Sequence, residues 1–282
     1  MQQCAYATLS NRKSGVLDVK VALPGFKALA HALHLEILPI PATENGPDLD
    51  ALAALCSSRS ARAIYSMPTL HNPLGWVMGL EQREQLVAIA RKHDLHIIED
   101  AAYAFLVENP PTPLAELAPE RTVYVSGFSK SVAAGLRVGF IVAPAKKGGA
   151  LERVIRVTAW NATGVMTAIT SARLDDGTVS RLEAQKRKDA QARQLIADEL
   201  LAGLHRVRHP SSYFVWLPLS EDARADQVAA ALLREQVSVS TAQPFATSAH
   251  EPRAIRLALG SVDMNSLREG LAKVKWVVQA HA

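Results

Sequence analysis

Polar side chains of five chemical types follow short apolar segments of the sequence. Asn72 lies in the turn sequence Asn72-Pro73-Leu74-Gly75, and Asp100 ends another apolar segment, with Tyr103 three residues later. Lys130 follows a third segment directly, and Arg137 comes seven residues after it. The set offers an amide, a carboxylate, a phenol, an amine and a guanidinium, which together can bind a ligand that carries several charges.

Each of these residues has an ordinary structural explanation when it is taken alone. An Asn-Pro-x-Gly sequence is typical of a turn, an acid at the end of a strand commonly caps the next helix, and a loop lysine is commonly solvated. These separate explanations weaken if the five residues converge on one crevice. In an open parallel sheet, ligands bind beyond the carboxyl ends of the strands, and this is where the sequence puts all five.

The elements that must position these residues alternate between strand and helix in the first half of the chain. The apolar segments show almost no alternation with polar residues, which indicates strands buried on both faces of a parallel sheet. We therefore predict a doubly wound, mostly parallel α/β sheet. The predicted strands are Leu35–Ile40, Ala63–Met67, His96–Glu99, Val123–Ser126 and Val138–Val142, and the predicted helices are Gly25–His34, Asp48–Cys56 and Leu80–His93.

The pattern changes after residue 178, where a long charged helix is predicted from Ser180 to Leu204. Strands and helices follow it in a mixed order that is typical of a smaller α+β unit. We expect a large cofactor-binding domain over residues 1–178 and a small C-terminal domain over residues 179–282. Elements of the small domain are predicted at Tyr213–Leu217, Arg224–Gln236, Val237–Ser240, Ala254–Leu259 and from Met264 onward.

The side chains match the needs of a cofactor that withdraws electrons from a bound amine. Such a cofactor requires an amine for a Schiff base, a carboxylate that keeps a ring nitrogen protonated, and donors to a phenolate oxygen. It also requires a cation and hydroxyl groups for a phosphate. Ser126 and Ser129, on the N-terminal side of Lys130, supply the hydroxyl groups.

The sequence resembles the fold type I pyridoxal-phosphate aminotransferases of class I/II in the order and spacing of four motifs. Any one motif is weak, but four in register from about residue 24 to residue 282 are specific. In the residue sequence of its motifs, the chain is most similar to the aminotransferase-like domain of MocR-type transcriptional regulators of the GntR family. The motifs are Asn72-Pro73-x-Gly75, Asp100-x-x-Tyr103, Ser129-Lys130 with Arg137, and Ile255-Arg256-Leu257.

The resemblance implies catalytic roles for Lys130, Asp100 and Tyr103. Lys130 would bind pyridoxal 5'-phosphate as a Schiff base and move a proton at the α-carbon of the substrate. Asp100 would pair with the pyridinium nitrogen of the cofactor. Asn72 and Tyr103 would hydrogen-bond its phenolic oxygen.

The resemblance also implies which residues bind the phosphate and the substrate. Arg137, with Ser129 and Ser126, would hold the phosphate group of the cofactor. Arg256 would bind the α-carboxylate of the substrate through two parallel hydrogen bonds, and Asn72 would be a second substrate-binding residue. No metal ion is expected: His31/His34 and His93/His96 have a spacing that ligands can have on a helix, but the first pair has no obvious third ligand and the second pair runs into a predicted strand.

Two functions from different classes are compatible with this set of residues. The first is an enzyme, an aminotransferase that moves an amino group between an α-amino acid and a 2-oxo acid, and the resemblance implies a homodimer. The alternative is an effector domain of a MocR/GntR-type regulator that senses pyridoxal phosphate or an amino acid with little or no catalysis. We expect no DNA-binding winged helix in this chain.

Three features depart from the family pattern. Leu23 stands before Pro24 where the family has an aromatic residue that stacks on the cofactor, and Gly127 stands where a hydroxyl residue is common. The family's catalytic domain begins further upstream, so we expect a chain that is incomplete at its N-terminus, with Gln2-Gln3 as the tail of a phosphate-binding loop. The resemblance therefore implies a fragment or a reduced paralogue.

Composition excludes several other classes of protein. The 282 residues are 49% hydrophobic and 21% charged, as in a folded globular protein, and the net charge is +4. The basic cluster 186–188 lies in a helical pattern, which favours a solvated face over a nucleic-acid site. Cys4 and Cys56 have no metal or redox spacing, and no apolar stretch is long enough for a leader or a membrane span, so we expect a cytoplasmic protein. Neither a Gly-x-Ser-x-Gly elbow nor a dinucleotide-binding Gly-x-Gly-x-x-Gly is present.

Overall fold

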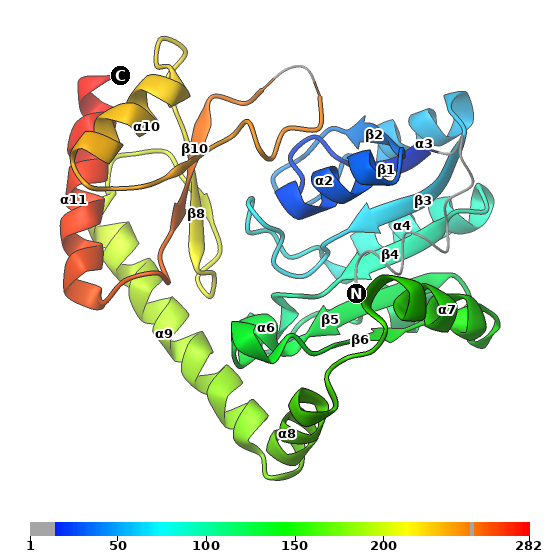
Figure 1. The fold of residues 1–282 in the computed structure, drawn as a ribbon. Coiled ribbons are helices and arrows are strands. Elements are labelled where there is room, and N and C mark those ends of the chain that lie inside the picture. The colour runs from blue at the N-terminus through cyan, green and yellow to red at the C-terminus, as the bar shows by residue number, and fades with distance from the viewer. Residues whose placement is uncertain (1–14, 249–250) are drawn as a thin grey trace.

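The computed structural model describes residues 15–248 and 251–282, which form two β-sheets and the helices around them (Figure 1). The expectations for Gln2-Gln3 and Cys4 lie outside the described residues. The strands of the larger sheet are β1 (Gly15–Val19), β2 (Glu36–Ile40), β3 (Ala61–Ser66), β4 (His96–Asp100), β5 (Thr122–Gly127) and β6 (Gly139–Val142). They are arranged in the order β2-β1-β3-β4-β5-β6.

The larger sheet is parallel except for its last strand, so the predicted doubly wound, mostly parallel sheet is confirmed. β6 pairs with β5 in the antiparallel direction. The connection between them spans only residues 128–138, whereas a parallel crossover needs about a dozen residues or more and usually a helix. β1 was not predicted, because the polar residues before it obscured the start of the fold.

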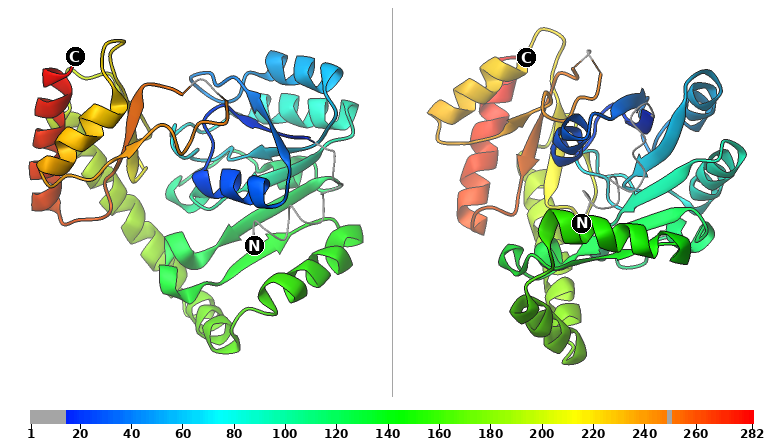
Figure 2. Two further views of the ribbon diagram at one scale, coloured as in Figure 1. Left: turned by 45° about the horizontal axis from the view of Figure 1, so that its top comes forward. Right: turned by 45° about the vertical axis from the view of Figure 1, so that its right-hand side comes forward.

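Helices cover both faces of the larger sheet (Figures 1 and 2). Phe26 and Ala30 of α2 pack against β3 and β5 on one face, while Leu52 of α3 and Leu86 of α4 pack against β1 and β3 on the other. The helices are α2 (Pro24–Ala32), α3 (Leu49–Ser58), α4 (Leu80–Lys92), α5 (Leu114–Leu117), α6 (Phe128–Ser131), α7 (Gly148–Ala159) and α8 (Gly164–Asp175), with short 3₁₀ turns η1 (Ala104–Leu106), η2 (Ala134–Leu136) and η3 (Ala145–Lys147).

The second sheet follows a long helix that leads away from the larger sheet (Figure 1). The long helix begins two residues before the predicted start at Ser180 and ends at Leu200, four residues before the predicted end. The domain boundary at residue 178 stays a prediction. The helices of this part are α9 (Thr178–Leu200), α10 (Ala225–Arg234) and α11 (Met264–Ala280). The strands, in sheet order, are β7 (Val207–Arg208), β8 (Phe214–Pro218), β10 (Ala254–Ala258) and β9 (Ser240–Thr241).

A shared apolar cluster joins the two sheets. Trp216 of β8, with Phe245 and Ala254, packs in the same buried cluster as Trp76 and Met78 from the segment after β3. The smaller sheet also has its own core against α9, α10 and α11. The contact between the sheets fixes how β10 faces the strand ends of the larger sheet. Among the described helices, none has the length and apolar character that crossing a membrane requires.

Asp18, whose side chain is of a charged type, is buried near the end of β1. It is 2% exposed, and its Oδ1 accepts a hydrogen bond from the Val19 amide at 2.8 Å while its Oδ2 has no partner among the described residues. Burial raises the pKa of Asp18 well above its ordinary value, and the nearby Asp100 raises it further. Burial therefore favours the neutral, protonated form of this acid inside the sheet.

Replacing Asp18 with Asn should stabilise the protein increasingly as the pH rises. The folded chain holds a proton on Asp18 that the unfolded chain releases, so the parent loses stability between the ordinary Asp pKa and the raised one. Asn keeps the acceptor for Val19 and does not titrate. We expect the advantage of Asp18→Asn in urea unfolding to grow by up to about 1.4 kcal/mol per pH unit over this range. A difference that does not change with pH would contradict the buried neutral acid.

Candidate active site

The segment after β3 is a largely buried loop that carries Asn72. Arg83 of α4 is fully buried and donates hydrogen bonds to the Pro68 carbonyl at 3.0 Å and to Thr69 Oγ1 at 2.8 Å. Burial lowers the pKa of His71 to about 3, so its ring is neutral where it packs against Trp76. Asn72 is 3% exposed, and its Oδ1 has no partner in the part of the chain that the structure describes.

Asp100 ends β4 with its carboxylate buried and held by two donors. The Tyr65 hydroxyl donates to Asp100 Oδ2 at 2.6 Å, and the Ala102 amide donates to Oδ1 at 3.0 Å. Tyr65 comes from the neighbouring parallel strand β3, and its ring stacks on Phe26 with centroids 4.4 Å apart. The orientation of the carboxylate is therefore set by the pairing of β3 with β4.

Lys130 lies in the short helix α6, directly after β5. Its Nζ is 5.7 Å from the centroid of the Tyr103 ring, within the range of a cation–π interaction, and the residue is exposed. The Tyr103 ring meets Phe214 of the smaller sheet edge-on, with centroids 5.6 Å apart. Tyr103 thus connects the lysine to the smaller sheet.

Gly127 is required by the close approach of β5 and β6. A Cβ atom at Gly127 would lie 2.9 Å from the Val138 carbonyl oxygen and 2.9 Å from the Gly139 Cα. Both atoms belong to backbone, which cannot move aside as a side chain can. In this chain, the close contact with the β6 backbone therefore favours glycine over a hydroxyl residue at this position.

Arg256 of β10 lies between two aromatic rings. Its Cζ is 5.3 Å from the centroid of Phe214 and 5.7 Å from that of Phe245. Its Nε is buried without a partner among the described residues. Burial lowers the pKa of the guanidinium, and Tyr103 partly offsets this effect. A buried donor without a partner indicates a place where an anion completes the hydrogen bonding.

One pocket of about 480 Å³ brings together three of the predicted residues, Lys130, Tyr103 and Arg256. Asn72 and Asp100 are not among the residues that line it. The other lining residues are Phe105, Leu182, Gln185, Lys186, Asp189, Tyr213, Phe214, Ala258, Gly260 and Ser261.

The residues predicted to bind a phosphate are less tightly grouped. Ser126 donates to the Ala101 carbonyl at 3.3 Å and lines a different cavity of about 850 Å³ beside α8 and α9. Ser129 is half-buried, one residue before Lys130. Arg137 is exposed, with a left-handed backbone conformation at φ 52°. Their roles stay predictions.

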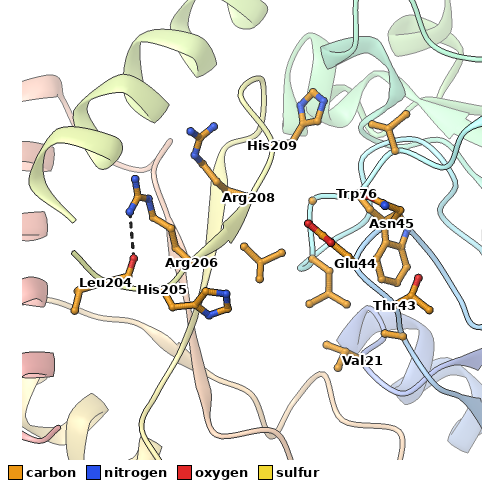
Figure 3. A pocket seen from close by; sticks show the side chains of 15 residues that line it. Val21, Thr43, Glu44, Asn45, Trp76, Leu204, His205, Arg206, Arg208 and His209 are labelled. Carbon is orange, nitrogen blue, oxygen red and sulfur yellow. Dashed lines mark hydrogen bonds between the residues drawn. The ribbon is translucent and has the colours of Figure 1, made fainter. Parts of the chain in front are cut away.

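Another cavity, of about 1010 Å³, lies between the loop after β3 and the smaller sheet (Figure 3). His205, Arg206 and Arg208 lie on one side of it, opposite Glu44 and Trp76. Both arginines form ion pairs with the same carboxylate, that of Asp198, at 3.1 Å and 2.6 Å. One carboxylate therefore balances one of the two guanidinium charges on this wall, and none of the predicted site residues lines the cavity.

Sequence reasoning missed Tyr65, Phe214 and Phe245. Tyr65 lies in a predicted strand, but only the register of β3 against β4 shows that its hydroxyl meets Asp100. The two phenylalanines come from the smaller sheet and its loops, whose packing on the larger sheet leaves no local pattern in the sequence. Among residues 15–248 and 251–282, no three His, Cys, Asp or Glu side chains gather as metal ligands.

The chain belongs to the family described as aminotransferase class I and II, whose sequence profile matches residues 1–274. The uncharacterized HTH-type transcriptional regulator YdeF of Bacillus subtilis is 25% identical over 88% of this chain and 54% of its own length. The 2-aminoadipate transaminase of Thermus thermophilus is 28% identical over 91% of this chain and 68% of its own. The chain thus spans between about half and two thirds of the length of these relatives, and the predicted resemblance to both groups is confirmed.

Solved structures of aminotransferases share this fold. LysN, the α-aminoadipate aminotransferase of Thermus thermophilus in complex with N-(5'-phosphopyridoxyl)-L-leucine, superimposes with a TM-score of 0.91 at 25% identity over 99% of this chain and 74% of its own. An archaeal alanine:glyoxylate aminotransferase gives a TM-score of 0.90 at 24% identity over 99% of this chain and 73% of its own. The predicted fold type I is confirmed.

Gly75→Ala should destabilise the junction between the Asn72 loop and the smaller sheet. Gly75 has φ +71°, where an L-residue costs about 1–2 kcal/mol, and an added Cβ would lie 3.0 Å from the backbone at Arg208 and His209. We expect the free energy of unfolding to fall by about 2 kcal/mol or more. Gly270→Ala, in open space within α11, is the matched control and should stabilise by up to about 1 kcal/mol. Equal effects of the two changes in urea unfolding would contradict the close contact.

Proposed function

We propose that the chain transfers an amino group between an α-amino acid and a 2-oxo acid, with pyridoxal 5'-phosphate as its cofactor. The observation that carries the proposal is the pocket shared by the Lys130 amine, the Tyr103 ring and the half-buried Arg256 guanidinium. The family and the name of the Thermus relative, 2-aminoadipate transaminase, support an amino acid as the substrate.

The donor set of the chain fits this cofactor. Lys130 offers an amine on the surface of the pocket, and Asp100 offers a buried carboxylate at a strand end. Asn72 Oδ1 and Arg256 Nε are buried polar atoms without partners in the described residues, which a polar ligand would satisfy. When bound, pyridoxal phosphate supplies an electron sink for the substrate α-carbon.

Each side chain would contribute a separate physical effect. Lys130 would attach the cofactor through Nζ and move the proton at the substrate α-carbon. Asp100, fixed by the Tyr65 hydroxyl, would keep the cofactor ring nitrogen protonated through its negative charge. Asn72 and Tyr103 would hydrogen-bond the phenolic oxygen.

Anion binding would fall to the arginines and the hydroxyl groups. Arg256 would bind the substrate α-carboxylate with two parallel hydrogen bonds, and the rings of Phe214 and Phe245 would keep water away from it. Arg137, Ser129 and Ser126 would hold the phosphate.

We also propose that the chain works as a homodimer. Large apolar side chains on α7 and α8 and between them are exposed to a degree that is unusual for a monomer: Val157 is 82% exposed, Trp160 73% and Val165 65%. A second copy that covers them is consistent with twofold assembly. Light scattering should give twice the mass of one chain, and a stable monomer would contradict this part of the proposal.

A sensor function is the second candidate, because curated relatives of this chain include HTH-type transcriptional regulators. A sensor would bind the cofactor and an amino acid without releasing a 2-oxo acid. Both candidates use the same pocket, so binding alone does not separate them. Formation of a 2-oxo acid separates the enzyme from the sensor.

A single-turnover assay tests the enzyme directly. Chain loaded with pyridoxal phosphate is mixed with each common amino acid in turn, and the 2-oxo acid released is quantified. At least one amino acid should give about one equivalent per bound cofactor, and Arg256→Gln should raise the amino-acid concentration needed by about tenfold or more. The control is Arg234→Gln, an exposed arginine on α10, which should match the parent. Amino-acid binding without any 2-oxo acid would favour the sensor and refute the enzyme.

A further inference from the structure

A further pocket, of about 600 Å³, lies between the smaller sheet and α11. Leu257 of β10 lines it, whereas the preceding residue, Arg256, lines the pocket of Lys130. Successive side chains of a strand point to opposite faces, and α11 lies on the side of β10 that faces away from the larger sheet (Figure 1). The two pockets therefore lie on opposite faces of the smaller sheet, and they share only Ala258 and Ser261.

The pocket opens where β9 and β10 separate. β9 pairs with β10 over two residues, and the segment before β9, which carries Val237 and Val239, does not continue the pairing. Both valines line the pocket and are half-buried, and the buried Leu257 and Leu271 line it as well. A concave site with such a lining favours an apolar ligand.

Gly270 leaves open space beside this pocket. It is an interior residue of α11 and lines the pocket, and an added Cβ would meet no atom within 4 Å. Glycine inside a helix lowers its stability relative to alanine, and here no neighbouring group in the described part of the chain requires it. Glycine is typical of positions where a ligand approaches the backbone closely, so the open space at Gly270 favours a bound chain over a tighter core.

Lys273 supplies a cation at one end of the pocket. Its Nζ donates to the Glu235 carbonyl at 2.9 Å, and the next residue, Gln236, lines the pocket together with Lys273. The lysine is half-buried, and this carbonyl is the partner that its ammonium has within the described residues. An ammonium has three donors, so two remain for an anionic ligand.

Glu269 is the acidic residue that lines the same pocket, four residues before Lys273 on α11. Its side chain is exposed, where water weakens the interactions of a charge, whereas that of Lys273 is half-buried. The stronger electrostatic preference of the pocket is therefore for a negative group at the Lys273 end.

We propose that this pocket binds a medium-chain aliphatic carboxylate, with the carbon chain between β9, β10 and α11 and the carboxylate on Lys273. The apolar lining, the space left by Gly270 and the cation at one end carry the inference. None of the residues to which the proposed function gives a role lines this pocket, so the inference does not depend on that function.

Calorimetric titration of the chain with octanoate, octanol and octylamine, below the concentrations at which they form micelles, tests the class of ligand. Octanoate should bind about tenfold more tightly than octanol, because its carboxylate forms a charge-assisted hydrogen bond with Lys273. Butanoate should bind more weakly than octanoate, by up to about fourfold for each methylene group removed. Octylamine or octanol that binds as tightly as octanoate would overturn the inference.

Two variants on α11 assign the carboxylate to Lys273. Lys273→Gln should reduce the preference for octanoate over octanol to about twofold or less. The control is Lys275→Gln, a half-buried lysine two residues along the same helix that does not line the pocket, which should behave as the parent does. Equal losses in the two variants would contradict the assignment.

Filling the space beside Gly270 tests the place of the carbon chain. Gly270→Leu should weaken octanoate and octanol alike by about tenfold or more, because its side chain takes the space of the ligand. Ala272→Leu, at an exposed position of the same helix, is the control and should leave both affinities unchanged. If Gly270→Leu does not fold, as judged by circular dichroism, Gly270→Ala replaces it and should weaken both ligands by a smaller factor. Unchanged binding in a folded Gly270 variant would overturn the inference.

Competition with the cofactor separates this pocket from that of Lys130. Saturating pyridoxal phosphate should leave the affinity for octanoate within about twofold of its original value, because the two sites lie on opposite faces of the smaller sheet. Octanoate that pyridoxal phosphate displaces would be bound in the Lys130 pocket, and the inference would be wrong while the proposed function stood.

Discussion

A carboxylate buried at the end of a parallel strand has to be compensated by its neighbours, and Asp100 is compensated by the Tyr65 hydroxyl and the Ala102 amide. This interaction depends on the register of β3 against β4, because a slip of one residue would turn the Tyr65 side chain to the opposite face. The stacking of Tyr65 on Phe26 extends the same requirement to α2. The position of the acid is thus a property of the whole sheet.

The smaller sheet supplies Arg256, the guanidinium beside the Lys130 pocket. Arg256 reaches the strand ends because Trp216 and Phe245 pack into the apolar cluster around Trp76 and so hold β10 against the Asn72 loop. The rings beside the guanidinium remove water from it, which strengthens its interaction with an anion. Arg256 and Asp100 therefore come from two different sheets that share one apolar cluster.

The sequence could predict the features that local patterns encode. Alternation of buried strands with helices such as Leu80–His93 led to the doubly wound sheet, and motif spacing led to Lys130, Asp100 and Arg256. It could not predict β1, because the polar residues that precede it hide a strand of only five residues. It also could not show that Ser126 points to the Ala101 carbonyl, since the direction of a side chain near the end of a strand depends on long-range pairing.

The central claim is that Lys130 is the amine that binds pyridoxal phosphate. Borohydride reduction of the loaded chain, followed by peptide mapping, measures this directly because reduction fixes the cofactor to the nitrogen that holds it. The account predicts one pyridoxyl group per chain, on Lys130. Label on another lysine such as Lys186, or no label with the cofactor in excess, would contradict it.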